Sequence, residues 1–151
     1  MGCLCPKDSL IQDILDSHNE IRTIHHSPIL KQNIELNELA EKYSKDIAED
    51  KACNGNSYKG LFLGENIYIC RGLTFDQKEM CNDWYNEKNN YDKQLNQYQK
   101  KTCHFTQMIW KETKEIGFGM YKKNGVYYAV VFYYPPGNTL GEYQENVFLP
   151  K

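Results

Sequence analysis

Residues 103–110 read Cys-His-Phe-Thr-Gln-Met-Ile-Trp, and the rest of the chain is organised around them. The pattern predicts a short helix that begins near His104, continues through the polar pair Thr106 and Gln107, and ends in three apolar residues. A polar side chain on a rigid apolar support is what a functional site requires, so His104 is the first candidate site residue. Lone histidines are also common in ordinary amphipathic helices, and the local pattern by itself favours an incidental one.

The composition limits the class of protein. The 151 residues include 18 basic and 20 acidic side chains, for a net charge of −2, and 40% of the residues are apolar. A chain of this size and polarity is expected to form one globular domain that buries roughly 70% of its unfolded surface. Nucleic-acid-binding domains are usually strongly basic, so we expect no nucleic-acid partner.

Helical periodicity dominates the first half of the chain. A capping box at Ser9 predicts the start of a first helix, whose apolar residues recur at helical spacing until near Ile24. A second amphipathic helix is predicted over residues 36–50. A third helix is expected to begin at the capping box formed by Thr74 and Gln77.

The second half carries the clearest β-strand pattern. Two strands are predicted at 116–121 and 126–134, and the intervening Asn124-Gly125 pair supplies the positive φ angles of a tight hairpin turn. The polar stretch 86–101 is expected to be a surface loop. Helices at the front and a hairpin near the end predict an α+β layered fold.

The residues ahead of the first helix are predicted to form a flexible tail, residues 1–7, before a single domain at 8–151. Gly2 is where a myristoyl chain would attach, although the usual Ser or Thr of that signal is replaced by Pro6. Cys3 and Cys5 are placed for palmitoylation, and two acyl chains anchor a protein where one does not. A disordered tail with two exposed thiols is the equal alternative.

The cysteines leave two compartments open. No apolar run of signal-peptide or membrane-span length is present. If the first methionine is the native start, the six cysteines are expected to be mostly free thiols in a reducing compartment. If a signal peptide has been removed, their even number permits disulfides in a secreted protein. The absence of a CxxC pair argues against a structural zinc site.

Four motifs in the same order resemble those of the CAP superfamily, which comprises cysteine-rich secretory, antigen-five and pathogenesis-related proteins. Residues 103–110 resemble its first signature and residues 133–138 its second. Residues 18–22 are similar to the family's first helix, and residues 64–67 to its third motif. The likeness covers the predicted domain, and it implies an α-β-α sandwich with an antiparallel sheet between helical layers.

Within that family, the chain is most similar to the Golgi-associated plant pathogenesis-related type. Its ending, residues 137–151, and its Met-Gly start carry this likeness. Val131 stands where the second signature usually holds a disulfide cysteine, which favours the reduced compartment. The resemblance therefore implies an intracellular protein on the cytosolic face of Golgi-like membranes, with secretion as the alternative.

The resemblance also implies a central cleft lined by two histidines and two acidic residues. His104 matches one histidine, Glu65 one acid and Glu79 the other, while the second histidine position falls at or near Asn54. Zinc favours imidazole nitrogen among its ligands. With a single imidazole, Glu65, Glu79 and His104 would hold a divalent cation such as zinc only weakly.

Two functions follow as hypotheses. The first is a non-enzymatic, membrane-associated protein that binds anionic lipids or sterols, helped by a basic face of seven lysines (Lys93, Lys100, Lys101, Lys111, Lys114, Lys122, Lys123). The second is a protein-interaction or regulatory module, in signalling or immune modulation, that acts as a homodimer. A metal-dependent hydrolase is the least favoured reading, because no serine or cysteine lies in a nucleophile motif.

Overall fold

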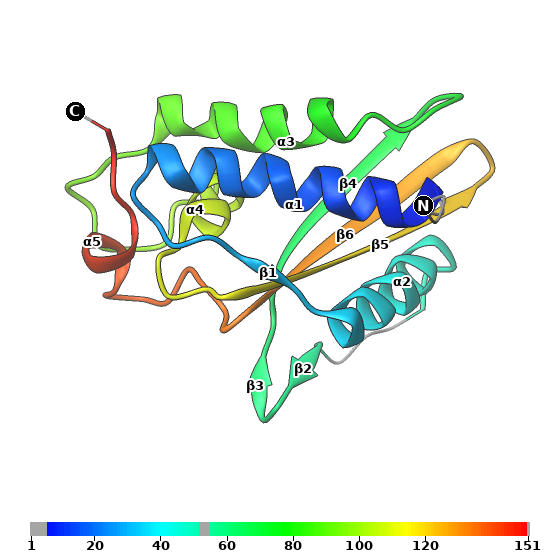
Figure 1. The fold of residues 1–151 in the computed structure, drawn as a ribbon, viewed down its shortest axis with the longest axis horizontal. Helices are drawn as coiled ribbons and strands as arrows, with labels where there is room; N and C mark the ends of the chain where they lie inside the picture. The colour runs from blue at the N-terminus through cyan, green and yellow to red at the C-terminus, as the bar shows by residue number, and fades with distance from the viewer. Residues whose placement is uncertain (1–5, 52–54, 151) are drawn as a thin grey trace, which may run out of the picture.

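A four-stranded sheet forms the centre of the computed structural model, which describes residues 6–51 and 55–150 (Figure 1). Its strand order is β1-β5-β6-β4, and every neighbouring pair is antiparallel except the short parallel pair of β1 with β5. The strands are β1 (Lys31–Gln32), β4 (Gly64–Arg71), β5 (Glu115–Lys123) and β6 (Val126–Tyr134). A separate two-stranded hairpin, β2 (Ser57–Tyr58) with β3 (Leu61–Phe62), projects from the body of the molecule.

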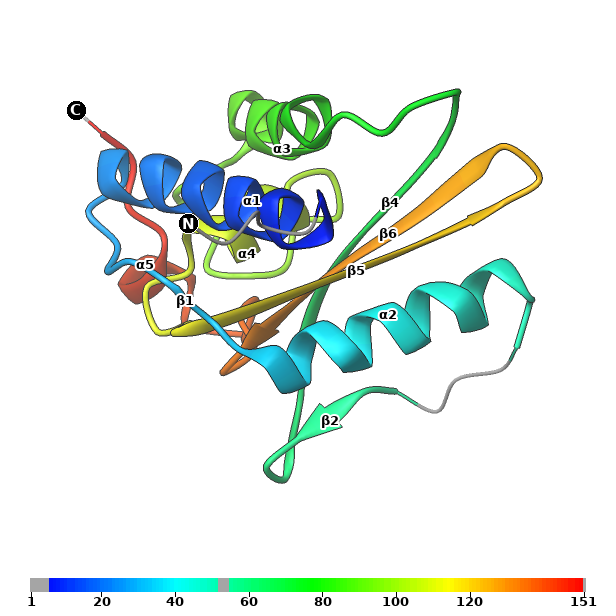
Figure 2. The same cartoon turned by 45° about the vertical axis from the view of Figure 1, so that its right-hand side comes forward.

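Helices cover both faces of the sheet (Figure 2). One face carries three helices: α1 (Pro6–Ile24), α3 (Gln77–Asn86) and α4 (Cys103–Ile109). The other face carries α2 (Ile34–Ala48), which packs on β5 and β6. Two short helices complete the chain, η1 (Glu87–Asn90) and α5 (Tyr143–Asn146). The expected α-β-α sandwich is confirmed.

Two helices do not begin at the capping residues that the sequence predicted. The first helix already includes Pro6, where the described residues begin, so Ser9 lies inside it rather than at its start. At α3 the cap is Asp76, whose side chain accepts the Lys78 N–H at 2.9 Å, so the predicted capping box of Thr74 and Gln77 is not used. A carboxylate one residue before the helix competes better for these N–H groups than a more distant hydroxyl.

The hairpin of β5 and β6 has the turn that the sequence predicted. Asn124 and Gly125 have φ angles of 51° and 75°, and Lys123 pairs with Val126 on either side of them. β6 is the central strand and is buried on both faces. Its residues alternate between the two cores. Ala129, Val131 and Tyr133 face the core under α1, α3 and α4, and Val130 and Phe132 face the core under α2.

Two glycines on β5 let α2 lie directly on the strand. A Cβ atom added at Gly117 would lie 2.4 Å from the Leu36 carbonyl carbon, and one at Gly119 would lie 2.0 Å from the Glu41 nitrogen. Both contacts are with helix backbone, so neither can be relieved by a side-chain rotation. The strand therefore needs a residue without a side chain at each crossing.

Arg22 fixes the opposite helical layer from inside the protein. It is fully buried and donates hydrogen bonds to four backbone carbonyls, those of Pro28, Met108, Trp110 and Thr113, at 2.7–3.0 Å. Burial lowers the pKa of its guanidinium to about 10, which still leaves it charged at neutral pH. The carbonyls near the end of α4 carry the negative end of the helix dipole, so they solvate this cation in place of water.

In the part of the chain that the structure describes, no helix has the length and apolar character needed to cross a membrane.

Candidate functional site

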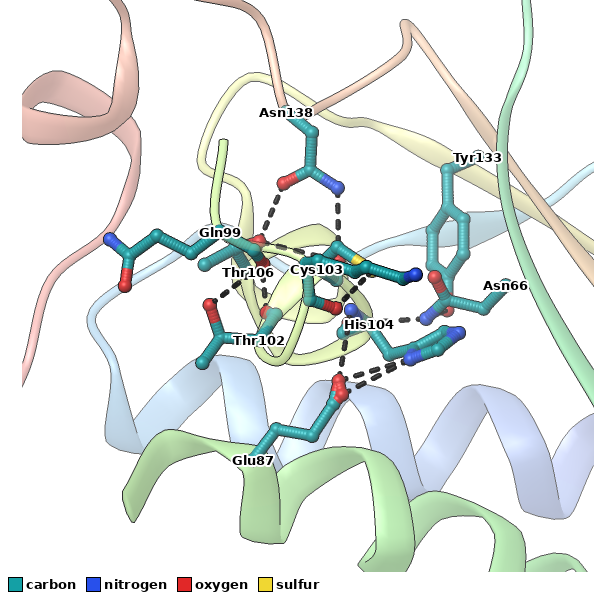
Figure 3. A network of polar contacts seen from close by, with 10 residues as sticks. Asn66, Glu87, Gln99, Thr102, Cys103, His104, Thr106, Tyr133 and Asn138 are labelled. Carbon is teal, nitrogen blue, oxygen red and sulfur yellow. Dashed lines mark hydrogen bonds and ion pairs between the residues drawn. The ribbon is translucent and has the colours of Figure 1, made fainter. Parts of the chain in front are cut away.

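The start of α4 is held by residues from other segments. Its capping position, Thr102, makes no side-chain cap hydrogen bond. Instead Asn138 accepts from the Thr106 hydroxyl at 2.5 Å and donates to the Cys103 carbonyl at 2.9 Å (Figure 3). Asn138 has a φ of 57°, a conformation that asparagine tolerates better than most residues. The second signature motif thus fastens the helix of the first.

Glu87 completes this cap and also orients His104. One carboxylate oxygen accepts the His104 backbone N–H at 3.1 Å, and both oxygens lie 3.0–3.1 Å from the ring Nδ1. Figure 3 shows the carboxylate facing the backbone and the ring together. A carboxylate is an acceptor, so Nδ1 is the nitrogen that donates to Glu87, and in the neutral tautomer Nε2 keeps its lone pair. The His104 side chain is 35% exposed, which leaves one edge of the ring accessible.

A tryptophan and an asparagine set the position of the His104 ring and backbone. Trp84 of α3 is buried and stacks on the imidazole, with ring centroids 5.7 Å apart and an interplanar angle of 9°. Asn66 of β4 donates to the His104 carbonyl and to the Tyr133 hydroxyl, each at 3.1 Å. The imidazole is therefore held from α3 and the backbone from the sheet.

The same asparagine begins a buried chain of hydrogen bonds that reaches α1. The Tyr133 hydroxyl lies 2.7 Å from Nε2 of His18, and Nδ1 of His18 lies 2.8 Å from the Ile14 carbonyl. Complete burial lowers the pKa of His18 to about 4, so its ring is neutral at pH 7. Its Nδ1–H then donates to Ile14 and its Nε2 accepts from the tyrosine. Burial also raises the pKa of Tyr133 well above its usual value, so the hydroxyl keeps its proton.

Glu65, the first acid expected in the cleft, lies next to Asn66 on β4 but points the other way. Successive strand residues face opposite sides of a sheet. Asn66 faces α4, while Glu65 pairs in register with Phe132, which stacks on Tyr43 of α2. Partial desolvation raises the pKa of the Glu65 carboxyl, and a hydrogen bond with Asn56 opposes this shift. No hydrogen bond joins Glu65 to His104 within residues 6–51 and 55–150.

Glu79, the second expected acid, is an exposed residue in the first turn of α3. It lies near Tyr68 and Cys70, whose pKa values its charge helps to raise after the larger effect of desolvation. Among the described residues, the acid that contacts His104 is Glu87. Sequence reasoning missed it although a signal was available. Glu87 follows Trp84 by three residues, the spacing that puts two side chains on one helix face, whereas Glu79 precedes it by five.

Four of the expected site residues lie outside the described residues: Asn54 and the lipidation candidates Gly2, Cys3 and Cys5. Across residues 6–51 and 55–150, no group of three or more His, Cys, Asp or Glu side chains is placed to hold a metal ion. Glu65, Glu79 and His104 therefore do not form a zinc-binding set in this structure.

A second surface stands out beside β2 and β3, and we call it the hairpin face. Its large apolar side chains are unusually exposed: 71% for Phe62, 70% for Ile34, 64% for Ile29 and 47% for Leu61. Three exposed lysines accompany them, namely Lys31, Lys59 and Lys114. Ile29, Lys31 and Lys114 also line a hollow of about 630 Å³.

Contacts of Tyr58 join the β2–β3 hairpin to the start of α2 and to Tyr134. The Tyr58 hydroxyl accepts from Asn33, the capping residue of α2, at 3.2 Å. Its ring packs edge-on against Tyr134, with centroids 5.1 Å apart, and Tyr134 lines the hollow. The β2–β3 hairpin is thus joined to the segment that carries Ile29 and Ile34.

The seven lysines expected to make one basic face do not do so. Lys114 precedes β5 and Lys123 ends it, and nine strand residues span roughly 30 Å. Lys122 and Lys123 lie at the turn end of the sheet, where Lys123 donates to the Ala48 carbonyl at 3.3 Å. Of the seven, only Lys114 belongs to the hairpin face.

Comparison with known proteins points in one direction. The family model described as "Cysteine-rich secretory protein family" (CAP) matches residues 15–134. The human "Golgi-associated plant pathogenesis-related protein 1" is 36% identical over 92% of each chain, and tobacco "Pathogenesis-related protein 1A" is 30% identical over 91% of this chain and 82% of its own. Among solved structures, Schistosoma mansoni venom allergen-like protein 4 superposes with a TM-score of 0.70 at 22% identity, covering 93% of this chain and 94% of that one.

Proposed function

The chain belongs to the CAP, or cysteine-rich secretory protein, family, and from that premise we propose that it is a non-enzymatic, membrane-associated protein that binds lipids. The observation that carries the proposal is the hairpin face. Large apolar side chains that are 47–71% exposed lie there beside three lysines. Soluble domains rarely leave such a cluster uncovered unless the surface binds something.

A membrane containing anionic lipid suits this face on both counts. Burying an exposed Leu, Ile or Phe side chain in the acyl boundary contributes on the order of 1 kcal/mol or more. A lysine near an anionic surface contributes about 1 kcal/mol. The acids in the neighbourhood are Glu35, on the first turn of α2, and Glu115, which accepts from Asn33 at 3.4 Å. Glu65, whose carboxyl hydrogen-bonds with Asn56 just before β2, is a third acid, and the contacts for anionic headgroups would come from Lys31, Lys59 and Lys114.

The cleft residue His104 fits a binding protein better than a hydrolase. Glu87 holds Nδ1 and leaves Nε2 free, as in an oriented base, but in the described part of the chain no hydroxyl or thiol is hydrogen-bonded to the ring. A hydrolase needs such a nucleophile next to its base, or a metal that activates water. We therefore assign Glu87 to holding the start of α4 and the orientation of the His104 ring, and no catalytic role to either residue.

The proposal includes a site of action. We place the protein on the cytosolic face of membranes, with acyl chains on Gly2, Cys3 or Cys5 as additional anchors. Support comes from the human relative, whose name describes it as Golgi-associated. Secretion is the alternative location.

Vesicle flotation tests the proposal. The full chain is mixed with vesicles of phosphatidylcholine containing roughly 30% phosphatidylserine, because the surface potential depends on anionic lipid. The double variant Leu61→Asp, Phe62→Asp should lose most of its recovery in the floating fraction. The matched control is Leu73→Asp, Leu140→Asp, which alters side chains that are 93% and 76% exposed elsewhere on the surface.

The outcomes separate the parts of the proposal. An equal loss of recovery in the two double variants would show that binding depends on surface hydrophobicity in general and not on the hairpin face, and it would overturn the proposal. Recovery of Gly2→Ala equal to wild type, with protein made in eukaryotic cells, would remove the acyl anchor alone. Loss of binding in the hairpin variant with retention in the control would support lipid contact through this face.

A protein-interaction module is the second candidate, and one observation favours it, the open strand edge described next. The homodimer remains a prediction, and light scattering of the purified chain over a range of concentrations would measure it.

A further inference from the structure

The outer edge of β5 lacks a partner strand over most of its length. β1 pairs with it only at Lys31–Glu115 and Gln32–Ile116. Beyond Ile116, no strand in the described part of the chain lies beside this edge. Figure 2 shows β5 lying between α1 and α2. An unpaired strand edge is a template for another extended chain unless the protein blocks it.

The register shows which backbone groups face outward. Lys123 and Val126 flank a two-residue turn, so they form a hydrogen-bonded pair, and such pairs recur at every second residue. The residues between them, including Met120 and Lys122, therefore direct their N–H and C=O groups away from β6. Two contacts confirm that alternate residues of β5 direct their backbone groups away from β6. The Phe118 N–H donates to Asn37, and the Ile116 carbonyl accepts from Asn33.

An apolar hollow lies against this part of the edge. It measures about 320 Å³ and is lined by Phe118, Gly119 and Met120 of β5, by Pro6 and Leu10 of α1, and by the ion pair of Lys7 with Glu41. Both partners of that ion pair are about half exposed, so the contact between α1 and α2 there is weak. The hollow can therefore receive a side chain from a strand laid beside Met120.

The charge at the far end of the edge is positive. Lys45 lies over the Tyr121 ring at 5.9 Å, and Lys122 over the Tyr127 ring at 4.8 Å. Neither ammonium group belongs to an ion pair among the described residues. The nearby acids Asp46 and Glu49 are already paired, with Lys42 and Lys51 respectively.

We propose that the open edge of β5 binds an extended segment of another protein, which adds as a strand beside Met120, places an apolar side chain in the hollow and, two residues further along on the same face, an acidic side chain near Lys122. Main-chain hydrogen bonds to Met120 and Lys122 supply the affinity. The hollow and Lys122 supply the selectivity. This site is separate from the hairpin face and does not depend on lipid binding.

A peptide selection against the full chain tests the proposal. A phage library of random ten-residue peptides is the probe, and the most enriched sequence is then synthesised. We expect enrichment of apolar residues at alternate positions followed by Asp or Glu. In amide-exchange NMR, the synthetic peptide should slow exchange at Met120 and Lys122 by about tenfold or more, as strand addition requires.

Two controls isolate strand pairing from simple contact. Met120→Pro removes the outward N–H without touching a bond to β6, and should weaken binding at least tenfold, while Met120→Leu should not. If Met120→Pro does not fold, N-methylation of alternate peptide nitrogens makes the same test on the ligand, leaving the protein unchanged.

Three results would overturn the proposal. One is a library that yields no enriched sequence. Another is a selected peptide whose affinity is indifferent to both Met120→Pro and N-methylation. The third is a concentration-dependent increase in mass that Met120→Pro abolishes, which would make a second copy of this chain the occupant.

Discussion

At the scale of single residues, Glu87 has two tasks that one carboxylate performs at once. It accepts the backbone N–H of His104 at the start of α4, and it fixes the proton of the imidazole on Nδ1. Trp84 holds the ring plane from the other side. The accessible nitrogen is consequently Nε2, presented on a ring that cannot rotate freely.

Glu87→Ala tests this assignment. The variant should lower the free energy of unfolding by about 1–2 kcal/mol, because a helix cap and a hydrogen bond to a polar ring are lost. Long-range ¹H–¹⁵N spectra should show the His104 ring changing from a predominantly Nδ1-protonated form to a mixture. Glu79→Ala, a change on the exposed face of α3, is the control and should leave the His104 tautomer unchanged. An unchanged His104 tautomer in Glu87→Ala would contradict the assignment.

His18 predicts how stability depends on pH. Its pKa falls from 6.5 in the unfolded chain to about 4 in the folded protein, mainly because of burial. Between these values the unfolded chain binds a proton that the folded protein does not, so stability is lost as pH falls through this window. The difference of about 2.5 units between the two pKa values corresponds to a loss of on the order of 3 kcal/mol in the free energy of unfolding once the whole window has been crossed.

Urea unfolding of wild type and His18→Gln at pH 7.0 and pH 4.5 measures this contribution. His18→Gln should be the less stable protein at pH 7.0, because it loses the hydrogen bonds to Tyr133 and Ile14. The gap between the two proteins should shrink toward pH 4.5. His25, whose pKa burial also lowers, acts in the same direction in both proteins and cancels. A gap that stays constant would show that His18 does not titrate as its burial requires.

At the scale of elements, the crossing of α2 over β5 depends on glycine. The helix backbone lies so close to Gly119 that an added Cβ would be 2.0 Å from a backbone nitrogen. Real Cβ atoms do not approach this closely, so the helix would have to move away from the sheet. The core under α2, formed with Leu36, Ala40 and Phe132, would then be opened.

Gly119→Ala should destabilise the protein by about 3 kcal/mol or more, in the range of overpacked cores, or prevent folding. The control is Gly72→Ala, where the nearest atom to an added Cβ is 3.4 Å away. That change should shift the midpoint of urea unfolding only slightly. Similar midpoints for the two variants would mean that α2 can adjust to the strand more easily than its backbone contact indicates.

At the scale of the whole molecule, the reactivity of the cysteine thiols depends on whether the helical layers stay packed on the sheet. Cys81 on α3 is buried in the core between helices and sheet, and burial raises the pKa of its thiol to about 12. Cys70 and Cys103 are only partly buried, and all three are free thiols. The reactive species is the thiolate, so both access and ionisation protect Cys81.

Alkylation with iodoacetamide followed by peptide mass spectrometry checks this prediction. In native buffer near pH 8, Cys103 should be modified well before Cys81. Adding urea should bring the rate at Cys81 up in step with global unfolding measured by circular dichroism. Early modification of Cys81 without urea would indicate that the α1–α3 layer opens independently of the rest.

Much of the fold follows from the sequence, because local periodicity and turn chemistry involve neighbours within a few residues. The Asn124-Gly125 turn, the β5–β6 hairpin and the helix of residues 103–109 are examples. Helix starts were less predictable, since Asp76 rather than Thr74 caps α3 and Ser9 lies inside α1. The family motifs placed His104 at the site, but spacing alone did not identify its acidic partner.

The sequence by itself therefore determined the main helices, the β5–β6 hairpin and the family, and with them His104 as a residue of interest, but not the short elements β1, β2, β3, η1 and α5. Only the tertiary structure decided what His104 contacts: Glu87 rather than Glu79, with Glu65 turned to the opposite face of β4. Only the tertiary structure shows that the side chains of the hairpin face lie in solvent and that most of the outer edge of β5 has no partner strand. The physical reason is that side-chain patterns encode the faces of single helices and strands, whereas contacts between distant segments depend on strand order and register. Those are fixed only when the layers pack.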